Sequence, residues 1–120
     1  WEIDRYVRFH RTSGTHGRPL VVLDTAADWQ WWLAGWQYVL DAAETTAADR
    51  VVMAFSFGPF IGFWTAFDAV VQRGALAIPT GGMSTRARLE LIVSSRATQV
   101  MCTRGSGRAG WVFTRSTCPH

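Results

Sequence analysis

The sequence has 120 residues, of which 48% are apolar and seven are Trp, and a formal net charge of +3 at pH 7. This composition excludes a disordered chain, and the length suits one domain, or part of one, with a real core. All twelve basic residues are Arg and they are dispersed along the chain, so nothing in the charge pattern favours a nucleic-acid partner.

The first residues, the longest uncharged run and the two cysteines further limit the classes of protein to which the sequence can belong. The chain begins at Trp1 rather than Met and has no apolar N-terminal signal, so we expect a fragment, a processed product or a partial gene. Gly58-Pro59 interrupts the uncharged run 51–67, which favours a buried strand, turn and helix over a membrane span. The two cysteines make no disulfide framework and no zinc site, and free thiols of a cytoplasmic protein are expected.

The stretch 12–19, Thr-Ser-Gly-Thr-His-Gly-Arg-Pro, combines two glycines, three hydroxyls and one cation. Glycines permit positive φ, so backbone N–H groups can converge on one point, and hydroxyls and a guanidinium add donors. This chemistry predicts a grip on a polyphosphate, although a hairpin turn without a ligand explains the spacing equally well. The common P-loop is excluded, because its second Gly would fall at Pro19.

The elements around this loop follow in order. Strands are predicted at 6–11 and 20–23. Thr25 and Asp28 form a capping box at the start of a helix. Residues at helical spacing on one face of that helix predict a core stripe rather than a ligand platform: Trp29, Trp32, Leu33, Trp36, Val39 and Leu40.

The rest of the chain predicts alternating strands and helices. Buried strands are expected at 50–55, 75–78 and 98–102, and an almost wholly apolar helix at 60–73. Ser84 caps a third helix. Its apolar residues are predicted to face inward and its arginines outward: Leu89, Ile92 and Val93 against Arg86, Arg88 and Arg96. The pattern is that of an α/β layer with a mainly parallel sheet.

The tail 104–120 breaks the pattern, since it has no acidic residue and no periodicity. A shifted reading frame, which we favour, and a genuine variant both explain it. Gly105, Gly107 and Gly110 imitate a dinucleotide fingerprint, but that motif needs a following helix and a later acidic residue that the chain does not provide.

Several motifs in order resemble the adenylate-forming enzymes, and within them the phenylacetate–CoA ligase-like group. The loop 12–19 is similar to their phosphate loop, and the resemblance continues through 24–25, 55–62, 74–76, 79–82 and 100–103. It implies that 1–103 is part of an N-terminal adenylation domain, a partial three-layer α/β unit with the phosphate loop between two strands. The tail 104–120 then stands as atypical, frameshifted or disordered.

The resemblance also implies the site residues. Phosphate and ATP contacts are expected from Thr12, Ser13, Gly14, Thr15, His16, Gly17 and Arg18. Arg18 stands where the family has Lys or Arg, and His16 stands where it often has Thr. The resemblance to an aromatic segment that borders the acyl pocket in the family implies that Phe57, Gly58 and Phe60 line an acyl pocket. Core packing is the alternative for Phe57 and Phe60, and we favour it for Phe60.

The implied activity is that of an ATP-dependent acyl- or aryl–CoA ligase, which activates a small carboxylic acid as its adenylate and passes it to coenzyme A, with Mg²⁺. The family's Mg²⁺-binding Glu segment, its ribose-binding Asp and its catalytic Lys have no counterpart in this sequence, which contains no Lys. No catalytic or metal-binding residue is therefore assigned, and the isolated chain is expected to be inactive, with the remainder of the ligase domain missing. A small non-catalytic α/β binding module is the alternative, and membrane association through the Trp- and Phe-rich helices is a weaker one.

Overall fold

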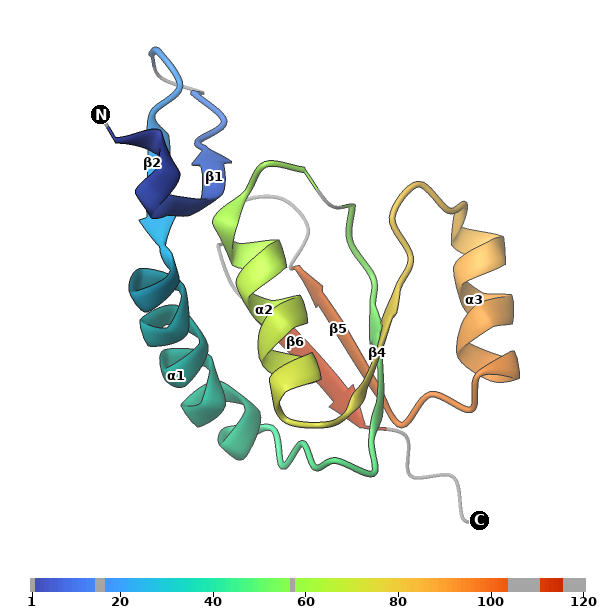
Figure 1. Cartoon of the computed structure of the whole chain (residues 1–120). Coiled ribbons are helices and arrows are strands. Elements are labelled where there is room, and N and C mark those ends of the chain that lie inside the picture. Colours follow the sequence, from blue (N-terminus) through green and yellow to red (C-terminus); the bar gives the residue numbers. More distant parts are fainter. Residues whose placement is uncertain (1, 15–16, 57, 104–110, 116–120) are drawn as a thin grey trace.

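The computed structural model describes residues 2–14, 17–56, 58–103 and 111–115. The described elements, in chain order, are η1 (Ile3–Arg5), β1 (Tyr6–Arg11), β2 (Val21–Thr25), α1 (Ala26–Ala42), β3 (Arg50–Met53), α2 (Ile61–Gln72), β4 (Leu76–Pro79), α3 (Thr85–Ser94), β5 (Gln99–Thr103) and β6 (Trp111–Arg115). Figure 1 shows a hairpin above α1, with α1 and α2 side by side and α3 on the far side of the sheet strands.

The strands form two separate sheets. β1 and β2 pair antiparallel as a hairpin, and the second sheet has the order β4-β3-β5-β6. β3 runs parallel to both β4 and β5, while β6 runs antiparallel to β5. The predicted α/β class, with a mainly parallel sheet, flanking helices and the Gly-rich loop between two strands, is confirmed.

The order of the strands fixes where a site can lie. The chain leaves β3 through α2 to reach β4, then returns through α3 to β5 on the other side of β3. Open α/β sheets bind ligands outside the carboxyl ends of their strands, where the order of the strands reverses. The segments 54–56, 58–60 and 80–84 lie at this end of the sheet.

Helix α1 buries one stripe of large side chains. Trp29, Leu33, Trp36 and Leu40 are buried, as the spacing predicts, and they join Val51, Met53, Met101, Ala66, Ala69 and Val70 in the core. Trp32 and Val39, placed in the same stripe by sequence, are each 38% exposed, so the buried face is narrower than predicted. The side chains at i, i+4 and i+7 from Trp29 therefore carry the packing.

The predicted capping box at the start of α1 is present. The Thr25 hydroxyl accepts the Asp28 backbone N–H, and the Asp28 carboxylate accepts the Thr25 backbone N–H at 2.9 Å. Thr25→Ala is expected to lower the free energy of unfolding by about 1 kcal/mol, measured by urea denaturation. Ser84→Ala removes the cap of α3, which has no buried residue, and should have a smaller effect on global unfolding. Equal effects of the two substitutions would contradict this assignment.

Helix α2 is buried through its small residues rather than its aromatic ones. Thr65, Ala66, Ala69 and Val70 are buried, whereas Trp64 is 39% and Val71 53% exposed. The sequence predicts an almost wholly apolar helix, but part of that apolar surface faces solvent. Small side chains let the helix approach both the sheet and α1, and the Trp36 indole N–H donates to the Thr65 hydroxyl at 2.8 Å across that contact.

Helix α3 differs most from its prediction. None of its residues is buried, and Leu89 and Val93, predicted to face inward, are 59% and 78% exposed. Arg88, predicted to point outward, is half-buried and its Nε donates to the Thr80 carbonyl at 3.3 Å. The helical period is correct, but the spacing alone does not say whether another element covers the apolar face.

The sequence predicts no element after residue 103, yet β6 lies at 111–115 and pairs with β5 over five residues, from Gln99↔Arg115 to Thr103↔Trp111. The Arg115 guanidinium contacts the Glu44 carbonyl and lies 3.6 Å from the Asp49 carboxylate. Residues 111–114 are Trp-Val-Phe-Thr, all types enriched in strands, so the local propensity for this strand was present in the sequence and the prediction missed it. Residues 104–110 and 116–120 of the tail lie outside the described residues.

Candidate functional site

The Gly-rich loop is closed at its neck by one pair of residues. The Thr12 backbone N–H donates to the Leu20 carbonyl at 3.0 Å, and the Thr12 hydroxyl accepts the Leu20 N–H at 2.8 Å. Thr12 thus fixes the width of the loop with its backbone and one lone pair, and its own O–H is still able to donate. Residues 13–19 form the part of the loop beyond this neck.

Gly14 is required by the path of the loop. Its φ is +68°, and a Cβ at this position would lie 2.8 Å from Cγ of Pro19. Both the conformation and the close approach therefore exclude a side chain. Gly17 differs, because its φ is not positive and a Cβ there would meet nothing within 4 Å; its N–H donates to the Gly14 carbonyl at 3.1 Å.

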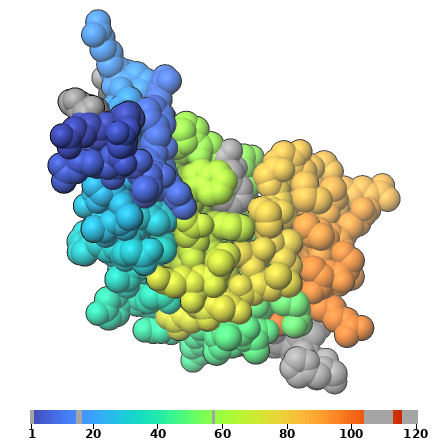
Figure 2. All heavy atoms as spheres, in the orientation of Figure 1, coloured from blue at the N-terminus to red at the C-terminus, as the bar shows by residue number. Residues whose placement is uncertain are grey.

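The remaining predicted loop residues face solvent where they are described. Ser13 and Arg18 are exposed, and Arg18 makes no ion pair with another described residue. Thr15 and His16 lie outside the described residues. Figure 2 shows the hairpin projecting beyond the packed body of the molecule, so a ligand can reach the loop from solvent.

The Gly58-Pro59 dipeptide joins the loop to the sheet. The Arg11 backbone N–H, at the end of β1, donates to the Pro59 carbonyl at 2.7 Å. The Trp64 indole N–H, from the first turn of α2, donates to the Gly58 carbonyl at 2.8 Å. Two consecutive carbonyls therefore hold the end of β1 on one side and the Trp64 side chain of α2 on the other.

A cleft of about 530 Å³ lies at the carboxyl ends of β3 and β4. Ser56, Trp64 and Phe67 line it from the β3–α2 side, and Pro79, Gly81 and Gly82 line it from the β4–α3 side. Its volume falls in the range of small-molecule sites, about 300–1,000 Å³. The cleft lies at the carboxyl end of the sheet, between the segments that follow β3 and β4, and no charged side chain is among its described lining.

The predicted acyl-pocket residues lie next to this cleft rather than in its lining. Gly58 is half-buried, and a Cβ there would lie 2.9 Å from the Phe60 ring. Phe60 is 39% exposed and packs edge-on against Phe63 with ring centroids 5.9 Å apart. Phe57 lies outside the described residues. Sequence reasoning missed Trp64 and Phe67 as lining residues, because their spacing on α2 is equally typical of a core face.

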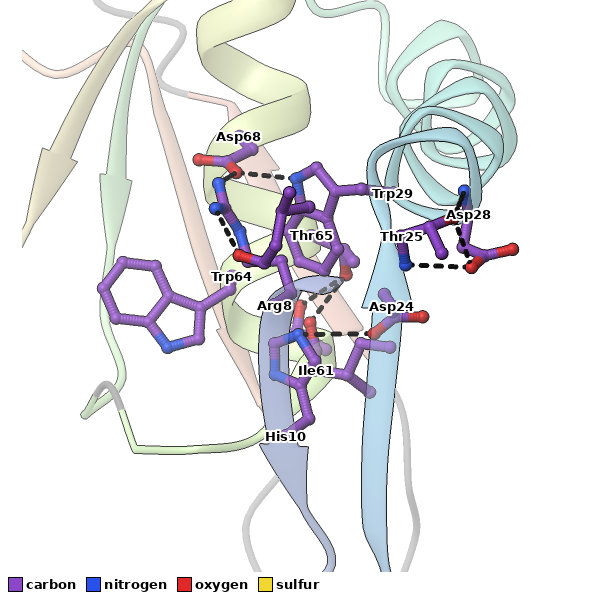
Figure 3. Close-up of polar contacts among 12 residues, drawn as sticks. Arg8, His10, Asp24, Thr25, Asp28, Trp29, Ile61, Trp64, Thr65 and Asp68 are labelled. Carbon is purple, nitrogen blue, oxygen red and sulfur yellow. Dashed lines mark hydrogen bonds and ion pairs between the residues drawn. The ribbon is translucent and has the colours of Figure 1, made fainter. Parts of the chain in front are cut away.

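A polar and aromatic cluster, which we call the hairpin anchor, fixes the hairpin to α1 and α2 (Figure 3). It comprises Arg8, His10, Asp24, Trp29 and Asp68. One Asp68 carboxylate oxygen accepts the Arg8 guanidinium at 3.0 Å and the Trp29 indole N–H at 2.9 Å. The Trp29 ring is contacted by Arg8, whose Cζ lies 4.8 Å from the ring centroid, and by the stacked His10 ring at 5.3 Å.

His10 and Asp24 are buried together within the anchor, 3% and 5% exposed. His10 Nε2 lies 3.7 Å from Asp24 Oδ2, which is too long for a hydrogen bond. Neither ring nitrogen of His10 has a hydrogen-bond partner among the described residues. Burial lowers the pKa of His10 from its ordinary 6.5, with the nearby Asp24 carboxylate opposing that change and the Arg8 guanidinium adding to it.

The lowered pKa predicts an acid-sensitive hairpin. The unfolded chain binds a proton at His10 below about pH 6.5, where the folded chain still resists it, so the free energy of unfolding should fall as the pH is lowered from 6.5 toward the lowered pKa. Urea denaturation at a series of pH values measures this slope. His10→Gln should flatten it, and an unchanged slope in that variant would place the acid sensitivity elsewhere.

The described residues contain neither a metal cluster nor a membrane-spanning helix. No group of three or more His, Cys, Asp or Glu side chains there lies in an arrangement that could hold a metal ion. No described helix is both long and apolar enough to cross a membrane. A second cleft, of about 570 Å³, lies at the opposite end of the molecule between α1 and β6.

Comparison with known proteins gives relatives of one kind. No family profile matches the chain. Phenylacetate-coenzyme A ligase of Escherichia coli (strain K12) is 32% identical over 101 residues, which are 84% of this chain and 23% of that enzyme. The ligase of the same name from Aromatoleum evansii is 29% identical over 100 residues. The chain therefore spans about a quarter of the length of the curated relatives that it matches.

Solved structures agree on the fold. A 2-hydroxyisobutyryl-CoA ligase, in complex with 2-HIB-AMP and CoA, superposes with a TM-score of 0.72 at 24% identity, over 83% of this chain and 22% of that chain. The fatty acid AMP ligase of Legionella pneumophila superposes with a TM-score of 0.60 at 17% identity, over 80% of this chain and 16% of that chain. At these identities the likeness establishes the fold alone.

Proposed function

We propose a function from one premise: this chain is a segment related to the adenylate-forming ligases, of the phenylacetate–CoA ligase-like group. In our proposal it supplies the phosphate loop and one wall of the acid cleft of an ATP-dependent acyl–CoA ligase. The whole enzyme would join a small carboxylic acid to AMP and then to coenzyme A.

The observation that carries this proposal is the Gly58-Pro59 junction. Pro59 holds the strand that leads into the loop, and Gly58 holds Trp64 at the cleft. Adenylate formation requires an acid carboxylate and the phosphates of ATP to meet in a fixed geometry, because positioning of the two reactants lowers the entropic part of the barrier. A junction that fixes the loop and the cleft to the same two residues would serve that requirement.

The loop would hold the β- and γ-phosphates of ATP. Ser13 and Arg18 are exposed beyond the neck, and the positive φ of Gly14 lets the loop turn back so that Gly14 packs against Pro19. Arg18 can bind a phosphate bidentately, and hydrogen bonds to an ionised group are roughly twice as strong as neutral ones. The family resemblance adds Thr15 and His16 to this set. Charge that develops on the departing pyrophosphate would be stabilised by the same donors.

The cleft would hold the body of the acid. Its described lining is apolar apart from the Ser56 hydroxyl, so an uncharged acyl or aryl group fits it and a second charge does not. The described residues offer no metal cluster, so Mg²⁺ and the groups that complete the reaction would come from the part of the ligase that this segment does not match. We therefore expect no acyl-adenylate from the chain alone.

Competition between phosphates tests the proposal directly. ATP should bind to the chain in isothermal titration, inorganic tripolyphosphate should displace it, and adenosine should not compete, because the loop contacts phosphate rather than base or ribose. Liposome flotation in parallel should leave the chain in the soluble fraction. Absence of ATP binding would favour the non-catalytic module, and competition by adenosine would assign the nucleotide to another surface.

A further inference from the structure

We propose that Asp68 is a positioning residue that sets the direction of the phosphate loop relative to α2, and that it acts through Arg8 on β1. This inference rests on the proposed function and deepens it, because it names a residue outside the loop and outside the cleft lining on which ATP affinity depends. Neither Arg8 nor Asp68 lies in one of the motifs that carry the family resemblance.

Two contacts join β1, the strand that leads into the loop, to α2 and the segment directly before it. At the end of the strand, the Arg11 backbone N–H donates to the Pro59 carbonyl at 2.7 Å. Three residues earlier, the Arg8 guanidinium donates to the Asp68 carboxylate at 3.0 Å. With a rise of about 3.3 Å per residue, the two contacts lie about 10 Å apart along the strand. One contact would let the strand pivot against α2, whereas two fix its direction.

Arg8 is held in one orientation. Its Cζ lies 4.8 Å from the centroid of the Trp29 ring, and its Nη1 donates to the Val7 carbonyl at 3.2 Å. The register of the hairpin shifts between Tyr6 and Arg8, and an irregularity of this kind changes the direction of the neighbouring side chain. A planar guanidinium held by a ring, a carbonyl and a carboxylate is a rigid link, so it passes the position of Asp68 on to β1.

Asp68 connects the loop with the cleft because of its place on α2. Phe67, the residue directly before it, lines the cleft. One Asp68 carboxylate oxygen accepts the Trp29 indole N–H at 2.9 Å as well as the Arg8 guanidinium, so α1 also holds the carboxylate in place (Figure 3). The wall of the cleft and the strand that carries the loop are therefore joined through one side chain.

The loop lies beyond the Arg11 contact, so it moves when the other end of the strand moves. If Arg8 is released, β1 can rotate about its contact with Pro59, and Ser13 and Arg18 then swing in the opposite direction. ATP binding has to restore one orientation of the loop, and the cost of ordering it weakens the affinity. A loop that is already oriented does not have this cost.

Asp68→Asn separates positioning from simple electrostatic attraction, because the two effects have opposite signs. The amide oxygen can still accept the Trp29 indole N–H, but the neutral side chain no longer forms an ion pair with Arg8. Loss of one negative charge should by itself strengthen the binding of the ATP polyanion, whereas loss of positioning should weaken it. We expect ATP to bind about two- to tenfold more weakly in isothermal titration, the range that such an ordering cost gives.

Glu90→Gln is the matched control. It removes the same charge from an ion pair with Arg86 at 2.9 Å, on α3 and away from the hairpin (Figure 1). Its affinity for ATP should equal or exceed that of the unmodified chain. Urea denaturation and near-ultraviolet circular dichroism show whether each variant is folded under the conditions of the titration.

Variants of the partner residue test the same link from the other side. Arg8→Lys keeps a cation beside the carboxylate and should bind ATP nearly as tightly as the unmodified chain. Arg8→Gln should weaken ATP binding more than Arg86→Gln does, since both remove one positive charge but only the first releases the strand. In the Asp68→Asn background, Arg8→Gln should weaken ATP no more than Arg86→Gln does, because the link is already broken.

The possible failures are distinguishable. If the unmodified chain binds ATP and Asp68→Asn binds it as tightly or more tightly, the positioning role of Asp68 is refuted while the proposed function stands. If Arg8→Gln and Arg86→Gln weaken ATP binding equally, the link through Arg8 is refuted. If the unmodified chain does not bind ATP, the proposed function fails and this inference fails with it.

Discussion

Trp29→Ala is expected to lower the free energy of unfolding by about 3–5 kcal/mol, the range for loss of a buried Trp. Trp29 is 4% exposed and lies at the centre of the hairpin anchor. Its removal leaves a cavity at the start of α1, takes the stacking surface from His10, and leaves Arg8 without the ring that its guanidinium contacts. The hairpin that carries the loop should therefore detach before the sheet unfolds.

The measurement is urea denaturation with amide hydrogen exchange. Trp31→Ala is the control on the same helix, because an exposed side chain outside the core usually changes stability by less than about 0.5 kcal/mol. Exchange in Trp29→Ala should rise first at β1 and β2 and later at β3 and β5. Similar losses for the two Trp variants, or uniform exchange, would contradict the assignment of the anchor.

The double variant Ser13→Ala/Arg18→Ala should lose ATP binding. Each contact to an ionised phosphate contributes about 1.5–3 kcal/mol. Loss of two such contacts weakens the affinity by about 10²–10⁴-fold, enough to remove the titration signal. Both side chains are exposed, so the fold should be unaffected and the free energy of unfolding nearly unchanged.

The control for this variant removes the same two chemical groups elsewhere. Ser94→Ala/Arg86→Ala lies on α3, where both residues are exposed and Arg86 pairs with Glu90 at 2.9 Å. It lowers the net charge equally, so any loss of affinity caused by general electrostatic attraction appears in both double variants. ATP binding that survives in the loop variant would show that the loop is only a hairpin turn.

Local sequence signals predicted the elements well. The capping box of Thr25 and Asp28, the Ser84 cap and the period of the α1 stripe are contained within a few residues, and each is present in the structure. Positive φ at Gly14 and the alternation of strands and helices could also be predicted from the sequence. These features depend on contacts between neighbours along the chain, which the sequence shows directly.

Features that depend on contacts between residues far apart in the sequence could not be predicted from the sequence. His10 and Asp24 meet only because the register of the hairpin places Arg8 opposite Asp24 and His10 opposite Val22, with both side chains turned toward Trp29. The exposure of Leu89 on α3 and the pairing of β6 with β5 likewise depend on which elements happen to lie alongside. The hydrophobic period and the helix or strand propensity of a segment do not show which elements lie beside it in the fold.

The candidate site likewise combines a local motif, which the sequence shows, with contacts between distant residues, which it does not. The loop residues were predicted as a contiguous motif, whereas the cleft brings together residues from the β3–α2 connection, from α2 itself, and from the end of β4 and the turn that follows it. Trp64 occupies a position where an apolar helical stripe predicts core. Its place in the lining of the cleft depends on contacts distant in the chain, because α2 packs beside the Gly81-Gly82 turn.

The most direct measurement asks whether the loop and the cleft form one site. Manganese–ATP is paramagnetic, so when it is bound at the loop it should broaden the ¹⁹F signal of 4-fluorophenylacetate that is bound in the cleft, and magnesium–ATP should not. We predict strong broadening in the unmodified chain and none in Ser13→Ala/Arg18→Ala. Both ligands binding without any broadening would contradict a shared site for phosphate and acid.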